Sequence, residues 1–194
     1  MLALVGFTCA RNYIKAHPLV FNESFFEHAH CMMQVGSALR LYASDHDGKY
    51  PSHTNGYGDA LLLLHQEKLL GNLKILAGPG GDTKVSEDAL KNHTDVDESK
   101  CSRVYVRGLN ENSDPEIAIL FDKVASPGDH CNGLRRLSAP FRREVCMTDG
   151  SVRVVPEREW PAFAKDQIER LVKAGIPKAE TERLYAPTLT RRQP

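Results

Sequence analysis

Histidines and cysteines that lie close together along the chain are the first residues that could carry chemistry. His28, His30 and Cys31 form one such group, and His28 and Cys31 would share a helix face because residues three apart are neighbours there. His130 and Cys131 are adjacent in a second group. Zinc favours these side chains, but a structural zinc site needs four ligands. The two groups therefore make a zinc site only if the fold joins them, and we assign no metal ligand.

The stretch LYASDHDGKYP offers a second set of candidate ligands. Asp45 and Asp47 precede Gly48, as in part of a calcium-binding loop. Such a loop also needs a bidentate Glu about seven residues past its Gly, and the next carboxylate here is Asp59. We therefore favour an architectural role over calcium binding. Gly48 suits the left-handed backbone just past a helix end, and Pro51 keeps the helix from continuing.

Nucleophilic catalysis would need a cysteine with a histidine close in space. Cys131 follows His130, but adjacency in sequence does not orient one side chain toward the other. Cys146 lies in a predicted buried strand, where a cysteine acts as a small hydrophobic residue. Asp129 and Asp149 could form an acid–base pair, although Asp149 already belongs to a turn. Base, nucleophile and oxyanion donor are not assembled by the sequence, so it favours a non-enzymatic role and gives no catalytic or cofactor-binding residue.

The composition is that of a globular protein. Of 194 residues, 41% are hydrophobic and 26% are charged, which gives a core and excludes an intrinsically disordered chain. Lys and Arg together number 25, as do Asp and Glu, so no basic excess points to nucleic acid. The apolar start MLALVGFTCA is too short for a membrane span. Arg135, Arg136, Arg142 and Arg143 flank a loop, and we expect them to be solvated or to meet an acidic partner.

Hydrophobic periodicity predicts helices at both ends of the chain and strands between them. Phe25, Ala29, Met32 and Leu39 form a helical stripe, and Asp149-Gly150 between alternating apolar residues indicates a hairpin. The predicted elements are helices at 24–45 and 58–70, a half-buried strand at 101–109, a central strand at 116–123, a hairpin at 143–156, and helices from 157 to Gly175 and from Pro177 to Tyr185. This order predicts an α+β fold: a long N-terminal helix on a small antiparallel sheet, followed by a C-terminal helical hairpin.

The same pattern suggests one main domain with additions at each end. The predicted segments are an N-terminal stretch at 1–22, an α+β domain at 23–157, C-terminal helices at 158–186 and a tail at 187–194.

The order of these features resembles that of type IV pilin-like and type II secretion pseudopilin-like proteins. In those proteins a helix ending in a Leu-x-x-Tyr-Ala-x-Asp-x-Gly-x-Tyr-Pro run leads into an antiparallel sheet. The later SPGDHCNG and EVCMTDGSVRVVP resemble the end of a planctomycete- and verrucomicrobial-type subgroup with a C-terminal His…Asp-Gly motif. The match spans residues 28 to 156. The matching motif residues are Leu39, Tyr42, Ala43, Asp47, Gly48, Tyr50, Pro51, His130, Asp149 and Gly150.

This chain departs from the family pattern in three places. The stretch between His130 and Asp149 is longer than in the family, and Ser151 stands where the family often has His. The leader and the first apolar half-helix are not part of this sequence. We therefore expect either a truncated start or a relative that retains the head domain without a membrane span.

The resemblance implies a non-enzymatic structural or protein-interaction module related to secretion or pilus machinery. It implies protein partners, envelope or secretion components among them, and a place in the cell envelope or periplasm, or in the cytoplasm if Met1 is the true start. One alternative is a small enzyme or sensor that depends on a metal or a thiol and uses His130 and Cys131. Another is a soluble regulator that binds a protein through the C-terminal helices. No cofactor is expected, with zinc or calcium as the alternatives.

Overall fold

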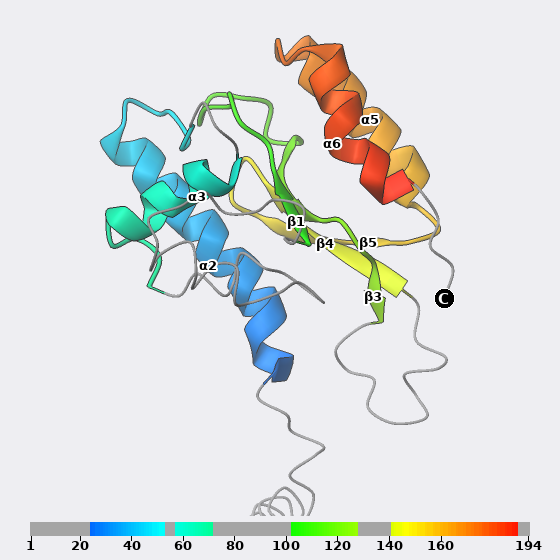
Figure 1. Cartoon of the computed structure of the whole chain (residues 1–194), viewed down its shortest axis with the longest axis horizontal. Helices are drawn as coiled ribbons and strands as arrows, with labels where there is room; N and C mark the ends of the chain where they lie inside the picture. The colour runs from blue at the N-terminus through cyan, green and yellow to red at the C-terminus, as the bar shows by residue number, and fades with distance from the viewer. Residues whose placement is uncertain (1–23, 53–56, 72–101, 128–140, 190–194) are drawn as a thin grey trace, which may run out of the picture.

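The structure, a computed structural model, describes residues 24–52, 57–71, 102–127 and 141–189, and within them it leaves the side chains of 24–31 and 57–59 undescribed. Figure 1 shows the helices gathered in two groups with strands between them. The elements are α2 (Ser24–Asp45), α3 (Tyr57–Gln66), β1 (Arg103–Tyr105), β2 (Ala118–Asp122), β3 (Ser126–Pro127), β4 (Phe141–Met147), β5 (Val152–Pro156), α5 (Trp160–Lys173) and α6 (Lys178–Leu189).

The strands form one antiparallel sheet around β4. β5 pairs with β4 along its length, whereas β2 pairs with the last residues of β4 and β3 with the first. β5 occupies one edge of β4, and β2 and β3 pair with different parts of its other edge. β1 pairs with the far edge of β2. A register shift between Ala118 and Leu120 interrupts the regular pairing of β2 with β4.

Helices cover both faces of the sheet (Figure 1). On β4, Cys146 faces α2, because a Cβ added to Gly36 would lie 2.7 Å from the Cys146 sulfur. Val145 faces the other way, since its cross-strand neighbour Phe121 stacks on Tyr185 of α6 at 4.5 Å between ring centroids. Successive strand residues point to opposite faces. The sheet is therefore an inner layer, with α2 on one side and α5 and α6 on the other.

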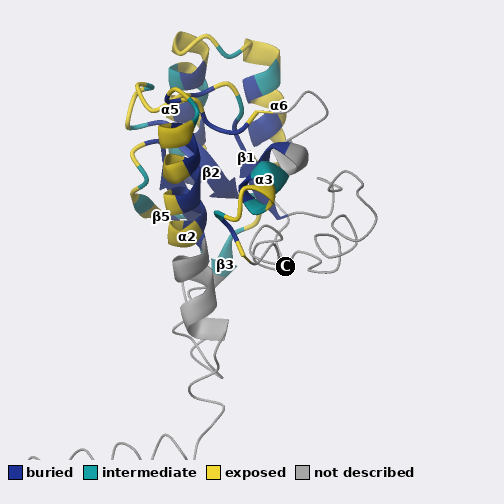
Figure 2. Cartoon of the chain, turned by 90° about the vertical axis from the view of Figure 1, so that its left-hand side faces the viewer, coloured by how far each residue is buried: buried dark blue, intermediate teal, exposed yellow. Residues whose placement is uncertain are grey.

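Burial on both faces explains the apolar sequence of β2. All five residues of β2 are buried, as the continuous apolar run predicted. Figure 2 shows this buried centre between more exposed helices. α5 and α6 contribute Trp160, Ala164, Leu171, Leu184 and Tyr185 to the same core. The C-terminal helices are thus part of the folded core.

The predicted fold class is confirmed at the level of α+β with an antiparallel sheet and C-terminal helices. The first turns of α2 fall where side chains are not described, so the full length of the N-terminal helix stays a prediction. The predicted end of the second helix at residue 70 is wrong. α3 ends at Gln66, because the backbone turns left-handed at Lys68 (φ 61°) and the amides of Leu69 and Leu70 both return to the Leu64 carbonyl.

Two further features differ from what the sequence pattern predicts: the end of α6 and the burial of β1. α6 continues past Tyr185 to Leu189 and includes Pro187, because buried Thr188 adds another contact on the face that carries Tyr185. β1 was expected to be half-buried, but all three of its residues are buried. Two of its side chains make polar contacts: Arg103 pairs with Asp122 at 3.3 Å, and the Tyr105 hydroxyl donates to the Pro51 carbonyl at 2.9 Å.

Arg143 corrects the expectation of a solvated basic loop, since it lies in β4 and is 4% exposed. Its guanidinium donates to both oxygens of Glu157, at 2.8 and 2.9 Å, and to the Thr188 carbonyl in the last turn of α6 at 3.1 Å. It also donates to the Lys123 carbonyl and lies 4.7 Å from the centre of the Trp160 ring. These contacts neutralise a buried charge, and they join β4 to the end of α6. Alternation with buried Val145 and Met147 was the sequence signal for an inward-facing side chain.

Candidate functional site

The end of α2 forms as the sequence predicted, with a left-handed turn at Asp47 (φ 53°) and Gly48 (φ 76°). The amide of Gly48 donates to the Ala43 carbonyl at 2.8 Å, which closes the helix. A side chain at position 48 would collide with Glu111, whose carboxylate oxygen lies 2.8 Å from the place of a Cβ. The left-handed backbone angle therefore favours glycine here, and any larger side chain would also have to displace the Glu111 carboxylate.

After this turn the chain crosses to the sheet. The amide of Tyr50 donates to the Leu109 carbonyl at 3.4 Å, and Lys49 forms an isolated bridge with Asn110. Tyr50 and Pro51 are both buried, and the Pro51 carbonyl accepts the Tyr105 hydroxyl. The run from Gly48 to Pro51 thus attaches the end of α2 to the segment around β1.

The two motif segments that carry the pilin-like resemblance meet in space. The Tyr50 hydroxyl donates to the Thr148 carbonyl at 2.6 Å, across 98 positions of sequence. From the middle of α2, Arg40 donates to the Asp149 carbonyl, and its aliphatic stem lies against Gly150. We call this arrangement the motif joint; it consists of Gly36, Arg40, Tyr50, Thr148, Asp149 and Gly150.

The turn of the β4–β5 hairpin is shaped to fit this joint. The amide of Gly150 donates to the Met147 carbonyl at 2.9 Å, and Gly150 is left-handed at φ 84°. This is a hairpin loop of three residues that ends in a glycine bulge, with Thr148 and Asp149 as its other members. The hydroxyl and amide of Ser151 both bond to the Asp149 carboxylate, and these bonds lower the pKa of Asp149. The aspartate is therefore ionised and holds the turn.

Gly36 allows α2 to approach the sheet at the motif joint. A Cβ at this position would lie 2.7 Å from the Cys146 sulfur and 3.5 Å from the Gly150 carbonyl. Cys146 is fully buried and forms no disulfide. Burial, followed by the charge of Asp149, raises the pKa of the Cys146 thiol to about 12. The thiol is thus protonated and packs as a small apolar group, as the sequence suggested.

The chemistry available at the motif joint is hydrogen bonding to backbone carbonyls. Burial raises the pKa of Tyr50, so its hydroxyl stays protonated and donates. Arg40 donates as well, and the acceptors are main-chain oxygens. A nucleophile and a general base would have to face a reacting atom, whereas these groups face each other. The motif joint is built to fix geometry.

His46, in the stretch considered for calcium, is engaged with protein groups. Its ring stacks on Tyr42 at 3.8 Å, and Nδ1 donates to the Tyr42 carbonyl at 2.8 Å. Nε2 lies 3.1 Å from Glu67, just past the end of α3. Within the part of the chain that the structure describes, no three His, Cys, Asp or Glu side chains gather closely enough to hold a metal ion. Asp45 and Asp47 thus stand at a helix end.

The candidate metal and thiol residues fall elsewhere. His28, His30 and Cys31 lie where the side chains of α2 are not described, and His130 and Cys131 lie outside the described ranges. Asp129, considered with Asp149 as an acid–base pair, also lies outside them. The metal- and thiol-based alternatives therefore stay predictions.

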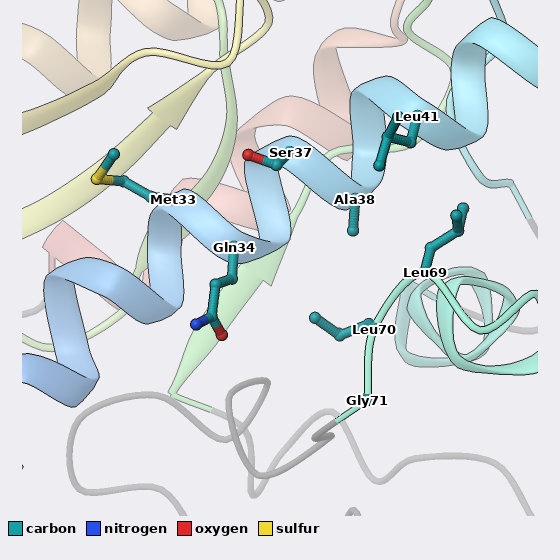
Figure 3. A pocket seen from close by; sticks show the side chains of 8 residues that line it. All are labelled: Met33, Gln34, Ser37, Ala38, Leu41, Leu69, Leu70 and Gly71. Atoms are coloured by element: carbon teal, nitrogen blue, oxygen red, sulfur yellow. The ribbon is translucent and has the colours of Figure 1, made fainter.

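An open groove of about 490 Å³ runs between α2 and the turn after α3. Figure 3 shows Met33 at one end and Leu41 near the other, with Leu69 and Leu70 opposite the helix. Met33 and Leu41 are 55% and 56% exposed. The lining residues are Met33, Gln34, Ser37, Ala38, Leu41, Leu69, Leu70 and Gly71. None of these side chains is an acid or a base, so the groove suits contact with an apolar surface better than catalysis.

Sequence reasoning missed Arg40, Thr148 and Glu111 at the motif joint and beside it. Gly36 had a signal, since a small residue in the middle of a helix predicts close packing. Arg40 and Thr148 had none, because a hydrogen bond to a distant carbonyl leaves no local pattern.

None of the helices among the described residues is both long and apolar enough to cross a membrane. A search of protein-family models, curated proteins and solved structures finds no match to the chain.

Proposed function

We propose that the chain is a non-enzymatic structural or protein-interaction module with a pseudopilin-like head. The observation that carries the proposal is the motif joint. Tyr50 belongs to the helix-end motif and Asp149-Gly150 to the C-terminal motif, and Tyr50 and Arg40 bond to carbonyls of that hairpin turn. Both bonds fix the hairpin turn against α2 and Tyr50, which is what residues with an architectural role are expected to do.

The character of the surface is consistent with such a role. The groove along α2 offers exposed apolar side chains and no titratable group. An apolar strip of this kind is typical of surfaces that contact other proteins. By the same resemblance, the partners are expected among secretion or pilus components of the cell envelope.

The regulator alternative can be refined by the packing of α6. Thr181, Leu184, Tyr185 and Thr188 are buried against the rest of the chain. A partner that binds through these helices would therefore have to use the opposite face of α6, which carries Glu182 and Arg183. Deleting the helix would disturb the core, so substitutions on that exposed face are the better test of this alternative.

Fractionation of the source cells tests the proposal. The native chain is identified in each fraction by intact mass and by its N-terminal peptide, and its neighbours are captured by crosslinking before lysis. Recovery in the envelope, crosslinked to secretion or pilus components, would support the proposal. Recovery in the cytosolic fraction without such neighbours would contradict it.

A further inference from the structure

We propose that β5 pairs with the β5 strand of a second copy of this chain, in antiparallel orientation, about a two-fold axis at Arg153. This goes beyond the proposed function and does not depend on it. The starting observation is the outer edge of β5. In the described part of the chain β5 pairs with β4 alone, so it ends the sheet on that side. Figure 2 places β5 at the margin of the molecule.

The hydrogen-bond pattern fixes which groups point outward. Met147 bonds to Ser151 at one end of the hairpin, and Glu157 bonds to Phe141 at the other. Bonded pairs alternate in an antiparallel ladder, so Arg153 and Val155 bond to β4, and Val152 and Val154 direct their N–H and C=O groups away from it. No described residue bonds to these outward groups. Alternating donors and acceptors on an edge are matched by an extended backbone.

The structure also selects the register. An axis at Val154 would place Val152 opposite Pro156, which has no N–H and whose carbonyl already accepts the Glu159 amide at 2.9 Å. An axis at Arg153 places Val152 opposite Val154 of the second copy. In that register each N–H of the two valines donates to a C=O of the other strand. Every outward backbone group of Val152 and Val154 then has a partner.

The side chains fit this pairing on both faces of the sheet. Val152 and Val154 lie on the α2 face, opposite Cys146 and Glu144 across the hairpin, and Val154 is 49% exposed. They would form apolar cross-strand pairs. On the other face Arg153 would meet its own copy, and like charges there are unfavourable. However, Arg153 is held by both oxygens of Glu116 at 2.6 Å, so two neutral pairs would meet.

Apart from Pro156 at its end, this edge carries little of the protection that usually opposes association. Natural edge strands commonly carry a lysine or an inward-pointing charge that opposes pairing. Here the only charged residue of β5 is Arg153, and Glu116 neutralises it. A second copy is therefore the occupant that presents the complementary strand, the complementary apolar pair and no net charge.

The mass of the purified full chain by sedimentation equilibrium, from low micromolar to several hundred micromolar, tests the proposal. We expect a concentration-dependent dimer, and we expect Val154→Lys to weaken it by about tenfold or more, because the lysine would face the apolar pair. Val172→Lys is the matched control, since Val172 on α5 is 40% exposed and should leave the dimer unchanged. Circular dichroism of both variants verifies that they fold.

A cysteine at the axis tests the register itself. Directly opposed residues in such a pair have Cβ atoms about 5 Å apart, close to what a disulfide needs. Arg153→Cys should therefore form a disulfide-linked dimer on mild oxidation that reductant reverses, above the level given by the native chain and by the exposed control Arg158→Cys. A native chain that stays monomeric over the whole range would overturn the proposal. So would a dimer that Val154→Lys leaves intact and Arg153→Cys does not crosslink.

Discussion

At the scale of single residues, the close approach of α2 to the sheet depends on Gly36. Its hydrogen faces the Cys146 sulfur, where a methyl group would sit at 2.7 Å. We expect Gly36→Ala to lower the free energy of unfolding by about 1–3 kcal/mol from overpacking, reduced by the gain of about 1 kcal/mol that alanine brings to a helix. Urea denaturation measures the change.

A double-mutant cycle makes the cause specific. Cys146→Ala removes the sulfur, so the combined variant should be more stable than the sum of the two single effects predicts. Gly71→Ala is the control, because no heavy atom beyond its own chain neighbours lies within 4 Å of its Cβ position. Additive effects of Gly36→Ala and Cys146→Ala would show that this contact does not limit the approach.

The Cys146 thiol gives a second prediction at this scale. Burial raises its pKa to about 12, so at pH 8 the thiolate that reacts with disulfide reagents is scarce and inaccessible. Titration of thiols in the native protein should give the same count for the native sequence and for Cys146→Ser. In denaturant the counts should differ by one. A difference in the native state would mean that Cys146 is reachable.

At the scale of elements, local signals predicted what local interactions decide. The end of α2 at Asp47-Gly48 and the Asp149-Gly150 hairpin followed from residues that tolerate left-handed backbone. The end of α3 was not predicted, because apolar Leu69 and Leu70 continue the helical pattern of the sequence. The helix ends before them, since the backbone at Lys68 is left-handed. The burial of Arg143 was also not predicted: the alternation with Val145 and Met147 indicates which way its side chain points, but its partners, Glu157 and the Thr188 carbonyl, lie in other segments.

α6 is the element whose docking is easiest to test. Tyr185 is fully buried and stacks on Phe121, so we expect Tyr185→Ala to destabilise the protein by about 3–5 kcal/mol. The single tryptophan, Trp160, is buried against the same cluster and its emission should shift to the red. Arg183→Ala on the exposed face of α6 should change neither quantity. An unchanged Tyr185→Ala would mean that α6 does not pack on the sheet.

At the scale of the whole molecule, three carboxylates link stability to acid pH. The amide of Glu116, and then Arg170, lower the pKa of Asp114. Arg153 lowers that of Glu116, and Ser151 that of Asp149. A depressed pKa in the folded state adds stability above the unfolded value of about 4, and this is lost as the pH falls through the folded value.

The urea concentration at the midpoint of unfolding should therefore fall as the pH is lowered from 5 to about 2. The fall should be larger in the native sequence than in a variant that lacks one of the groups that lower these pKa values. Arg170→Gln removes a donor to Asp114 and should flatten the acid side of the profile. Its midpoint at pH 7 should fall only slightly, because Arg170 and its partners are partly exposed. An acid profile identical to that of the native sequence would show that the pair with Asp114 does not contribute.

The arrangement of the whole molecule was the part that the sequence predicted least. Contacts between distant positions of the sequence decide the strand order and the bond between Tyr50 and Thr148. They also decide that α5 and α6 cover the face of the sheet opposite α2. The α+β fold class was predicted correctly, because that prediction depends only on the order of helices and strands along the chain. The motif residues could be predicted from the family resemblance. Their contacts could not, because they depend on how the hairpin turn lies against α2.

We infer that the motif residues hold α2, the crossing to the sheet and the hairpin turn in one geometry. The most direct measurement is the free energy of unfolding of Tyr50→Phe compared with Tyr185→Phe. Both tyrosines are buried, but the Tyr50 hydroxyl bonds to Thr148 whereas the Tyr185 hydroxyl has no partner among the described residues. We predict a loss of about 1–3 kcal/mol for Tyr50→Phe and no loss for Tyr185→Phe. Equal effects of the two substitutions would contradict the claim.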